Sequence, residues 1–338
     1  MNNTVIGIDI AKNVFQVCVM NELGKITINK RLVRTQVLEF ISKLPNYTVA
    51  LESCGGSSYW GREIRKLGFD VKLIPAQHVK PFVRNQKNDA NDAVAICEAA
   101  RRPDMRCVTP NTLEQQDLQN LHRIRERLVR SRTGLCNQVR GLLLEYGITI
   151  PQGRKKVRSK LLELIMDDKI SHNERSIWKS TFTTLYEELK ALDERIQNQD
   201  DEIIAISSNI EMCCKLEELP GVGPITSTAL IAAVSNARDF KNGRQFAAWL
   251  GLVPRQESSG GKTVLRGITK RGDKYLRKLL VHGARSDLRY AEKRKNSWAL
   301  KLKDKKGVNK TAVAMANKSA RRIWSVLAGV EQVKSHVA

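Results

Sequence analysis

The sequence predicts an α/β plus α fold, in which a mixed α/β domain precedes a mainly helical remainder. Up to about residue 76, β-rich runs alternate with helical stretches, which is typical of a mixed sheet covered by helices. Beyond a loop at 77–88 that is rich in Lys, Asn and Gln, the hydrophobic periodicity is helical. The charge is also uneven, because residues 255–338 hold 22 of the 58 lysines and arginines but only 6 of the 35 acidic residues. We therefore expect different parts of the chain to have different roles.

Five β-rich runs form the expected sheet, and helices separate the later runs. The second and third runs are joined by Asn-Glu-Leu-Gly, which is a hairpin signal. In chain order we expect strands at 4–11, 14–20 and 25–32, a helix at 35–44, a strand at 47–53, a helix at 57–68 and a strand at 70–76. With a short helix at 89–101, closed by Arg-Arg-Pro, these elements make a first domain of residues 1–110.

The middle of the chain, residues 111–212, is expected to form a helical linker and an arm. A long basic helix at 112–146 is interrupted by Pro151 and a cationic loop at 154–160. From 178 to 206, apolar residues recur at spacings of three and four, with Gln199 at one polar position: Leu185, Leu189, Leu192, Ile196, Ile203 and Ile206. This spacing predicts a coiled-coil-like arm, which packs either on the helix of a partner or as a hairpin within the chain.

The composition indicates a nucleic-acid partner inside a cell. A formal charge of +23 favours a polyanion, because each neutralised phosphate releases counterions. The seven cysteines form no Cys-x-x-Cys pair and share no ligand spacing with the five histidines, so we expect a reducing compartment and no zinc site. The N-terminus lacks an apolar signal core, and no run suits a membrane helix. We expect a cytoplasmic protein, bacterial and chromosome-associated, with no membrane partner.

Four acidic residues of the first domain are candidates for a metal site. Asp9 lies inside an apolar strand and Glu52 ends another, and a buried carboxylate is costly unless it is paired or binds a cation. Asp89 and Asp92 are three residues apart on a helix and share a face. Singly they have simpler explanations, such as a turn cap for Asp9 or a helix N-cap for Asp89. Together they form an oxygen-rich set that suits Mg2+ or Mn2+, and two such ions assist phosphodiester chemistry.

The segment 216–234 lies near the start of the expected C-terminal domain, residues 213–338. Its Leu-Pro-Gly-Val-Gly-Pro pattern, followed by a helix of small residues, is typical of a helix-hairpin-helix. Backbone N–H groups at Gly221 and Gly223 would then approach a phosphate at a helix start. Such a motif binds the nucleic-acid backbone without reading its sequence. An ordinary corner between two helices is the alternative.

The stretch 255–280 presents a serine hydroxyl among cations. Gly260 and Gly261 allow the chain to bend sharply next to Ser259. A serine is a poor nucleophile until it is activated, and no His/Asp partner is evident, so activation by the carboxylate–metal site is the economical hypothesis. A solvated basic loop is the alternative. Five nearby cations could bind phosphates or stabilise charge on a transferring phosphoryl group: Lys262, Arg266, Lys270, Arg271 and Arg277.

These motifs together resemble known proteins. A first strand with a central Asp, a β-meander, a fourth strand that ends in Glu and a later helix with two Asp resemble the RNase H-like fold of RuvC-type nucleases. The likeness to the insertion sequence one-ten family of transposases covers about residues 4–330. It is carried by GIDIAKNVFQV, ALESCGGSSYW, KNDANDA, LPGVGPITSTALIA and WLGLVPRQESSGGKTVLRGITKRGDKYLRKLLVHGA.

The resemblance implies a DNA recombinase. The family pairs a RuvC-like domain bearing a D-E-D-D tetrad with a C-terminal domain bearing a nucleophilic serine. The tetrad would be Asp9, Glu52, Asp89 and Asp92, and the nucleophile Ser259, with Ser258 as the other candidate. The resemblance further implies a covalent phosphoserine, Mg2+ assistance, guidance by a structured non-coding RNA, and dimers or tetramers.

Two other functions use some of the same residues. A structure-selective endonuclease of the Holliday-junction resolvase type would use the tetrad and leave Ser259 without a role. A non-enzymatic nucleic-acid binder would need only the basic tail and the helix-hairpin-helix, and would leave the four carboxylates unexplained.

Overall fold

The computed structural model describes residues 4–84, 88–167 and 176–330. The chain divides into two compact units. The first comprises the residues up to Gln116 together with Ala232–Lys241, and the second comprises Asp117–Ile231 and the residues from Asn242 onward. These units differ from the expected domains, because the arm and the C-terminal region belong to one unit.

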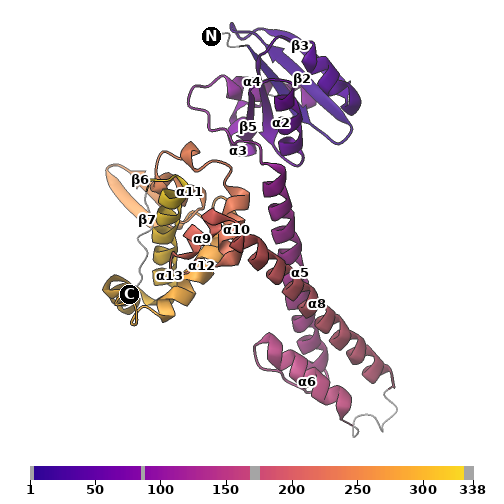
Figure 1. The fold of residues 1–338 in the computed structure, drawn as a ribbon, viewed down its shortest axis with the longest axis vertical. Helices are drawn as coiled ribbons and strands as arrows, with labels where there is room; N and C mark the ends of the chain where they lie inside the picture. The colour runs from indigo at the N-terminus through magenta and orange to yellow at the C-terminus, as the bar shows by residue number, and fades with distance from the viewer. Residues whose placement is uncertain (1–3, 85–87, 168–175, 331–338) are drawn as a thin grey trace. The chain divides into compact units, whose positions relative to one another are not determined.

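The first unit is built on a five-stranded mixed sheet (Figure 1). Its strands are β1 (Val5–Ile10), β2 (Val14–Met20), β3 (Ile26–Val33), β4 (Thr48–Ser53) and β5 (Val71–Pro75). They lie in the order β3-β2-β1-β4-β5. β1 pairs antiparallel with β2 and parallel with β4, which places β1 at the centre. The predicted strands are therefore confirmed, and the mixed sheet is compatible with the expected RNase H-like fold.

Helices cover both faces of this sheet because the strand residues alternate between two apolar clusters. Ile6 and Ile8 of β1 lie in the cluster with α1 (Val37–Ser42) and α2 (Ser57–Lys66). Val5 belongs instead to the cluster with α4 (Asp89–Ala100) on the opposite face. Short elements complete the unit: η1 (Arg34–Gln36), α3 (Ala76–Val79), η2 (Lys80–Phe82) and η3 (Ala237–Asp239).

The second unit is mainly helical and carries one β-hairpin. Its elements are α5 (Leu113–Leu144, which begins in the first unit), α6 (Arg154–Met166), α8 (Ser176–Ser208), α9 (Glu211–Glu217), α10 (Pro224–Ala233), α11 (Gly243–Trp249), β6 (Pro254–Ser259), β7 (Lys262–Ile268), α12 (Lys274–Arg289) and α13 (Ser297–Leu327). The cationic loop expected at 154–160 is wrong, because this stretch forms the first turns of α6. Val157 and Leu161, four residues apart, are buried there and hold the segment in a helix.

The arm packs within the chain. Leu189, Leu192 and Ile196 of α8 are buried in one cluster with residues of α5 and α6. The apolar spacing left two alternatives, and these residues follow the second one: they pack in a helical hairpin within the chain. An ion pair of 2.8 Å between Arg132 and Asp193 also joins α5 to α8.

A short segment of the later sequence returns to the first unit. Residues 232–241 pack there, where the Ser235 hydroxyl lies 2.8 Å from the Asn111 side-chain oxygen and 3.2 Å from the Thr109 carbonyl oxygen. Burial raises the pKa of the Asp239 carboxyl in the same segment. Among the helices that the structure describes, none is long and apolar enough to span a membrane.

Candidate active site

Two of the predicted metal ligands lie on neighbouring strands and face the same side of the sheet. β1 and β4 are parallel, with Ile8 opposite Leu51, so Asp9 and Glu52 follow directly at the next register position. Ile8 and Leu51 are fully buried on the face covered by α1 and α2. Because side chains alternate along a strand, both carboxylates point to the opposite face, which α4 covers. Both are half-buried.

Asp89 and Asp92 lie in the first turn of α4, on that same face. The N-cap of α4 is Asn88, whose side-chain oxygen accepts a hydrogen bond from the Asn91 N–H at 2.8 Å. The alternative explanation of Asp89 as the cap is therefore wrong. Both carboxylates stabilise the start of the helix, because their negative charges complement the partial positive charge of its N-terminus.

A close contact fixes α4 against β1 two residues before Asp9. A Cβ on Gly7 would lie 2.5 Å from Cys97 Sγ and 2.6 Å from the Ala93 carbonyl oxygen of α4. Only glycine fits such an approach of a helix to a strand. The sequence therefore sets the depth at which α4 lies over the strand that carries Asp9.

The Cys54 thiol reports the electrostatics of this region. Cys54 is exposed, yet partial desolvation raises its pKa, and the negative charges of Glu52 and Asp9 raise it further. Both carboxylates are thus close enough to act on one thiol. Cys54 was not expected here, although its position directly after β4 was a signal for it.

The four carboxylates supply the oxygen donors that Mg2+ prefers. They come from two strand ends and one helix start that share a face, which fits a divalent cation. Within the described ranges, however, no three acidic, His or Cys side chains lie close enough together to hold one. The fold brings the ligand-bearing elements together without bringing these side chains into a closed cluster.

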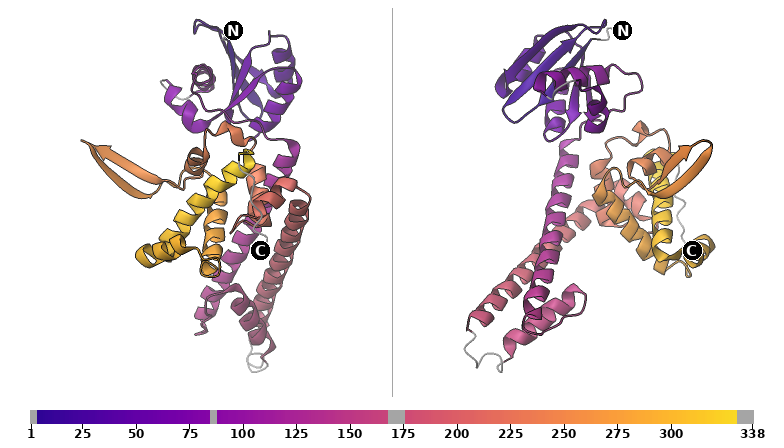
Figure 2. Two further views of the ribbon diagram at one scale, coloured as in Figure 1. Left: turned by 60° about the vertical axis from the view of Figure 1, so that its left-hand side comes forward. Right: turned by 180° about the vertical axis from the view of Figure 1, so that it is seen from behind.

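Ser259 ends β6 at the tip of an exposed hairpin. Gly260 and Gly261 form the connection with φ values of +53° and +76°, as a tight two-residue hairpin turn requires. The expected sharp bend is confirmed, but the flanking strands were not predicted. Figure 2 shows β6 and β7 standing out from the helices of their own unit. Val264 and Leu265 are 51% and 65% exposed, so the apolar side chains of the hairpin are not buried against the rest of the described structure.

Ser258 and Ser259 point to opposite faces of the hairpin, and they differ in their contacts. Ser258 Oγ accepts a hydrogen bond from the Gln256 amide at 2.8 Å and lies 3.3 Å from the Thr263 hydroxyl. For Ser259, which pairs with Lys262 across the strands, no side-chain hydrogen bond is present within the described contacts. Ser259 therefore presents the less encumbered hydroxyl.

The predicted cations have different surroundings. Lys262 and Arg266 share the face of Ser259, and Arg266 pairs there with Glu257 at 2.7 Å. Lys270 and Arg271 follow in an exposed loop. Arg277 Nη1 instead donates to backbone carbonyls, of Leu250 at 3.0 Å, Arg271 at 3.1 Å and Asp273 at 3.4 Å. Arg277 thus braces the loop that precedes α12.

The two glycines expected to face a phosphate also differ. α9 and α10 are joined by a turn in which Gly221 has φ +80°. A Cβ on Gly221 would lie 2.7 Å from the Gly283 carbonyl oxygen of α12, so this glycine serves a backbone-to-backbone contact. Gly223, just before α10, has no atom within 4 Å of its Cβ position, and that side of the turn is open.

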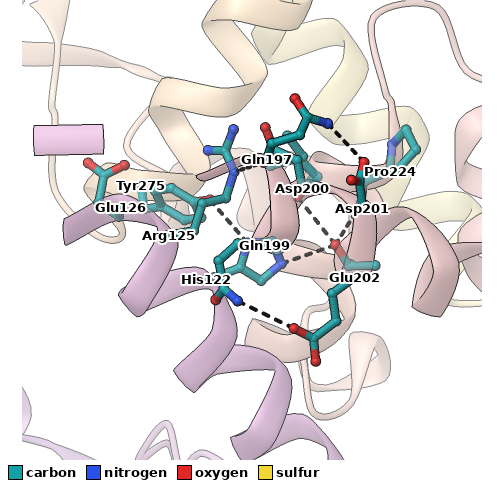
Figure 3. Close-up of polar contacts among 12 residues, drawn as sticks. His122, Arg125, Glu126, Gln197, Gln199, Asp200, Asp201, Glu202, Pro224 and Tyr275 are labelled. Carbon is teal, nitrogen blue, oxygen red and sulfur yellow. Dashed lines mark hydrogen bonds and ion pairs between the residues drawn. The ribbon is translucent and has the colours of Figure 1, made fainter. Parts of the chain in front are cut away.

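A buried polar chain anchors α12 to α5 and α10 (Figure 3). The Thr228 hydroxyl donates to the Pro224 carbonyl at 2.6 Å, so it accepts from His122 Nε2 at 3.0 Å. His122 Nδ1 is then the acceptor for the Tyr275 hydroxyl at 3.0 Å. Burial, with the nearby Arg125 charge, lowers the pKa of His122 to about 4, and burial raises the pKa of Tyr275 to about 12.

Charge pairs surround this chain and tie the same helices together. Arg125 of α5 pairs with Asp200 of α8 (Figure 3). Lys278 of α12 pairs with Glu126 of α5. The helix that follows the serine hairpin, α12, is therefore held by buried hydrogen bonds between neutral side chains and by ion pairs next to them. Sequence reasoning missed this network, because its members lie on four separate helices.

Two family profiles match the chain. One, described as Transposase IS116/IS110/IS902 family, matches residues 213–299, which include the serine hairpin. The other is described as Transposase, of the DEDD type, and matches residues 6–148, which include all four acidic residues.

Curated relatives match almost the whole chain. The transposase for insertion sequence element IS1111A of Coxiella burnetii is 43% identical over 326 residues, which is 96% of this chain and 89% of the relative. A probable family 20 transposase of Pseudomonas aeruginosa is 44% identical over 330 residues, 97% of both chains. The transposase for IS1328 of Yersinia enterocolitica is 40% identical over 328 residues, 96% of this chain and 97% of the relative.

Proposed function

Because this chain belongs to the IS116/IS110/IS902 family of transposases, we propose that it cuts and rejoins DNA through a phosphoserine formed at Ser259. The observation that carries the proposal is the contrast within the hairpin. Ser258 Oγ is engaged by neighbouring side chains, whereas Ser259 shares its face with Lys262 and Arg266, and its hydroxyl has no hydrogen bond within the described contacts. A nucleophile needs such an unencumbered oxygen and nearby positive charge.

In the proposed first step, Ser259 Oγ attacks the phosphorus of a DNA phosphodiester. The Oγ–P bond forms, one P–O bond to deoxyribose breaks, and the leaving oxygen takes up a proton as a free hydroxyl. The serine proton passes to solvent. Lys262 supplies positive charge to the phosphoryl oxygens, and Arg266 does the same once DNA displaces Glu257 from it. Rejoining is the reverse attack, by a deoxyribose hydroxyl on the phosphoserine.

The carboxylates are the proposed holders of a divalent cation. Asp9, Glu52, Asp89 and Asp92 would bind Mg2+, with Mn2+ as the alternative, and the bound cation would supply charge neutralisation at the phosphodiester. The donor chemistry and the shared face of Asp9 and Glu52 support this assignment. The resemblance to the family supports a composite assembly, in which the serine of one copy acts with the carboxylates of another.

Two further partners belong to the proposal. Guidance by a structured non-coding RNA is supported by the resemblance and by the strongly basic sequence of 255–338. Dimers or tetramers are supported by the resemblance alone. Because the apolar seam of α8 is buried within the chain, a subunit contact through the arm would use the outer faces of its helices. Gly223, Lys270 and Arg271 are the remaining proposed contacts to the nucleic-acid backbone.

The proposal is tested by looking for a covalent protein–DNA adduct. The purified chain is incubated with Mg2+, RNA from the flank of its element and end-labelled junction DNA, then denatured and resolved. We expect label that migrates with the protein, is lost in Ser259→Ala, and persists in the matched control Ser258→Ala. Omission of Mg2+ should also abolish it.

Metal-dependent cutting without an adduct would favour the structure-selective endonuclease and would overturn the serine mechanism. Binding without any cutting, unchanged in Asp92→Ala, would favour the non-enzymatic nucleic-acid binder.

A further inference from the structure

The turn between α12 and α13, together with the first part of α13, forms a basic corner at residues 289–310. It holds nine lysines or arginines but only two acidic residues, Glu292 and Asp304. Eight of the nine cations are exposed, and Lys303 is half-buried. Among the contacts that the structure describes, Arg294 alone pairs with an acidic residue, Asp287. The corner therefore presents a surface of largely uncompensated positive charge.

The backbone of the turn is fixed by hydrogen bonds that end one helix and begin the next. The Asn296 N–H donates to the Ala291 carbonyl oxygen at 2.9 Å, and the Lys295 N–H donates to the Glu292 carbonyl oxygen at 3.0 Å. This pair of bonds is the pattern of a Schellman motif. The Asn296 side-chain oxygen then accepts from the Ala299 N–H at 3.2 Å and caps α13. The basic corner is therefore a built turn with a defined shape.

Lys295 occupies the position of this motif at which glycine is usual. Its φ is +49°, in the left-handed region that is unfavourable for a residue with a Cβ. Within the described residues, Lys295 and Lys270 are the two non-glycine residues with positive φ. Glycine would close the turn with less strain, so folding gives no reason for a lysine here. A role of its exposed ammonium group does.

The first part of α13 presents two further lysines on one face. Trp298, Lys301 and Lys305 are spaced by three and four residues, and all three are exposed. Gly307 ends this part, because its φ of +77° interrupts the helix. Lys318 Nζ of the second part lies 4.9 Å from the centroid of the Trp298 ring. The indole is thus covered on that side by an ammonium group, and the face offers positive charge.

This chemistry suits the phosphates of a nucleic-acid backbone. Seven of the nine cations are lysines, whose ammonium groups act as point charges on phosphates, whereas base edges are read mainly by bidentate side chains. α12 has 16 residues, so at about 1.5 Å per residue the basic corner lies about 24 Å along this helix from the base of the serine hairpin. A solvated basic surface is the simpler explanation, but it gives no reason for a lysine in a glycine position.

We propose that the basic corner binds the sugar-phosphate backbone of duplex DNA through Lys295, Lys301 and Lys305, without reading its sequence. Duplex DNA is the partner to which we commit, because the chain belongs to a family of transposases, which are enzymes that act on DNA. Backbone contacts position a protein on a duplex and carry no sequence information. The inference rests on family membership and requires neither the phosphoserine nor the metal site.

The first test measures the affinity of the full chain for a short fluorescein-labelled duplex over a range of salt concentrations, with EDTA present so that metal-dependent cutting is absent. Each phosphate contact contributes about 0.9 to the slope of log K against log salt, so the double variant Lys301→Gln, Lys305→Gln should lower the slope by about 1.8. Lys179→Gln with Lys190→Gln is the matched control, because it removes the same charge from exposed positions of α8 in the same unit. The control should leave the slope unchanged.

The variant Lys295→Gly separates binding from folding. Because glycine adopts the left-handed conformation without strain, the midpoint in urea unfolding should not fall. The salt slope should nevertheless decrease by about 0.9, since one phosphate contact is lost. A lysine that serves only the fold would leave the salt slope as it is.

A footprint of the unmodified chain does not depend on the folding of any variant. The lysines are acetylated with and without the duplex, and mass spectrometry measures the extent of modification at each position. The duplex should protect Lys295, Lys301 and Lys305, whereas Lys179 and Lys190 should stay reactive.

Equal slopes for the Lys301→Gln, Lys305→Gln variant and its control, or no protection of the three lysines, would overturn the proposal. A lower slope with a structured RNA hairpin but not with the duplex would overturn the choice of DNA. A difference that appears with one duplex and not with another of unrelated sequence would overturn backbone binding. Because EDTA excludes cleavage, none of these outcomes bears on the adduct test of Ser259.

Discussion

The strands that carry the carboxylates and the strand that carries the serine are supported in opposite ways. In the central sheet, Ile8 and Leu51, the residues directly before Asp9 and Glu52, are fully buried. In the hairpin, every residue of β6 is exposed. An isolated two-stranded hairpin is marginally stable in water, whereas a strand paired on both sides within a covered sheet is rigid. Asp9 and Glu52 thus lie on a preformed platform, whereas Ser259 lies on an exposed element, which we expect nucleic acid or another subunit to order.

The largest expected effect is on DNA strand cleavage, when a carboxylate of the sheet is replaced. Asp9→Asn removes a negative oxygen donor while keeping the shape of the side chain, so strand cleavage should fall by about 1,000-fold, in line with the several kcal/mol that metal assistance contributes. The thermal midpoint should change little, because Asp9 is half-buried and its neighbours are retained. Glu39→Gln is the control, because Glu39 only pairs with Lys43 on the surface of α1. Equal activity of the two variants would remove Asp9 from the proposed metal site.

The second effect is on the stability of the platform. Gly7→Ala places a Cβ within 2.6 Å of the Ala93 carbonyl oxygen, so α4 must move away from β1. Overpacking of this kind destabilises a core by about 1–3 kcal/mol, and we expect a lower midpoint in urea unfolding for the first unit. Gly55→Ala is the control, because no atom lies within 4 Å of its Cβ position. An unchanged midpoint for Gly7→Ala would show that α4 is not held as described.

The third effect is a pH dependence in the unit that carries the hairpin. Because the pKa of His122 is about 4 in the folded chain and ordinarily 6.5, the unfolded chain binds more protons between these values. Stability should therefore be constant above pH 6.5 and should fall as the pH drops through this window, by about 2 kcal/mol at pH 5.

The measurement compares urea unfolding at pH 7.5 and pH 5 for three proteins. In His122→Gln this part of the pH dependence should disappear, whereas His282→Gln, at an exposed position of α12, should behave like the unmodified chain. The same loss on acidification in all three proteins would contradict the role of His122.

The smallest expected effect is at the hairpin turn. Gly260→Ala introduces a side chain at φ +53°, which destabilises the turn by about 1 kcal/mol. The unfolding midpoint should not change, because the hairpin is exposed, but adduct formation should fall severalfold. Gly267→Ala is the control within the same hairpin, since its Cβ position is open and it is not among the glycines with positive φ. A large drop in the midpoint for Gly260→Ala would contradict the independence of hairpin and core.

The sequence predicts the platform better than the hairpin for a physical reason. A run of apolar residues reveals a strand when the strand is buried, as in β1 and β2, whose residues are buried on both faces of the sheet. β6 and β7 bury neither face, so their Gly-Gly turn is recognisable while the strands beside it are not. The helix at 154–160 was missed because its dense positive charge obscured the spacing of Val157 and Leu161.

Long-range contacts could not be predicted at all. His122 and Tyr275 are 153 positions apart, and nothing local to either indicates the other. The same holds for Gly243 and Arg321, where α11 approaches α13 closely. The acids on β1, β4 and α4 were grouped by their residue types and by the resemblance to the family, and as metal ligands they stay a prediction. The structure adds that Asp9 and Glu52 lie at adjacent register positions of two parallel strands.

The most direct test of the central claim is to identify the residue that carries DNA in the covalent adduct. After nuclease digestion and proteolysis, tandem mass spectrometry can distinguish the two neighbouring serines at the hairpin tip. The account predicts a nucleotide linked through phosphate to Ser259. A nucleotide on Ser258, on another residue, or on no residue despite efficient cutting would contradict it.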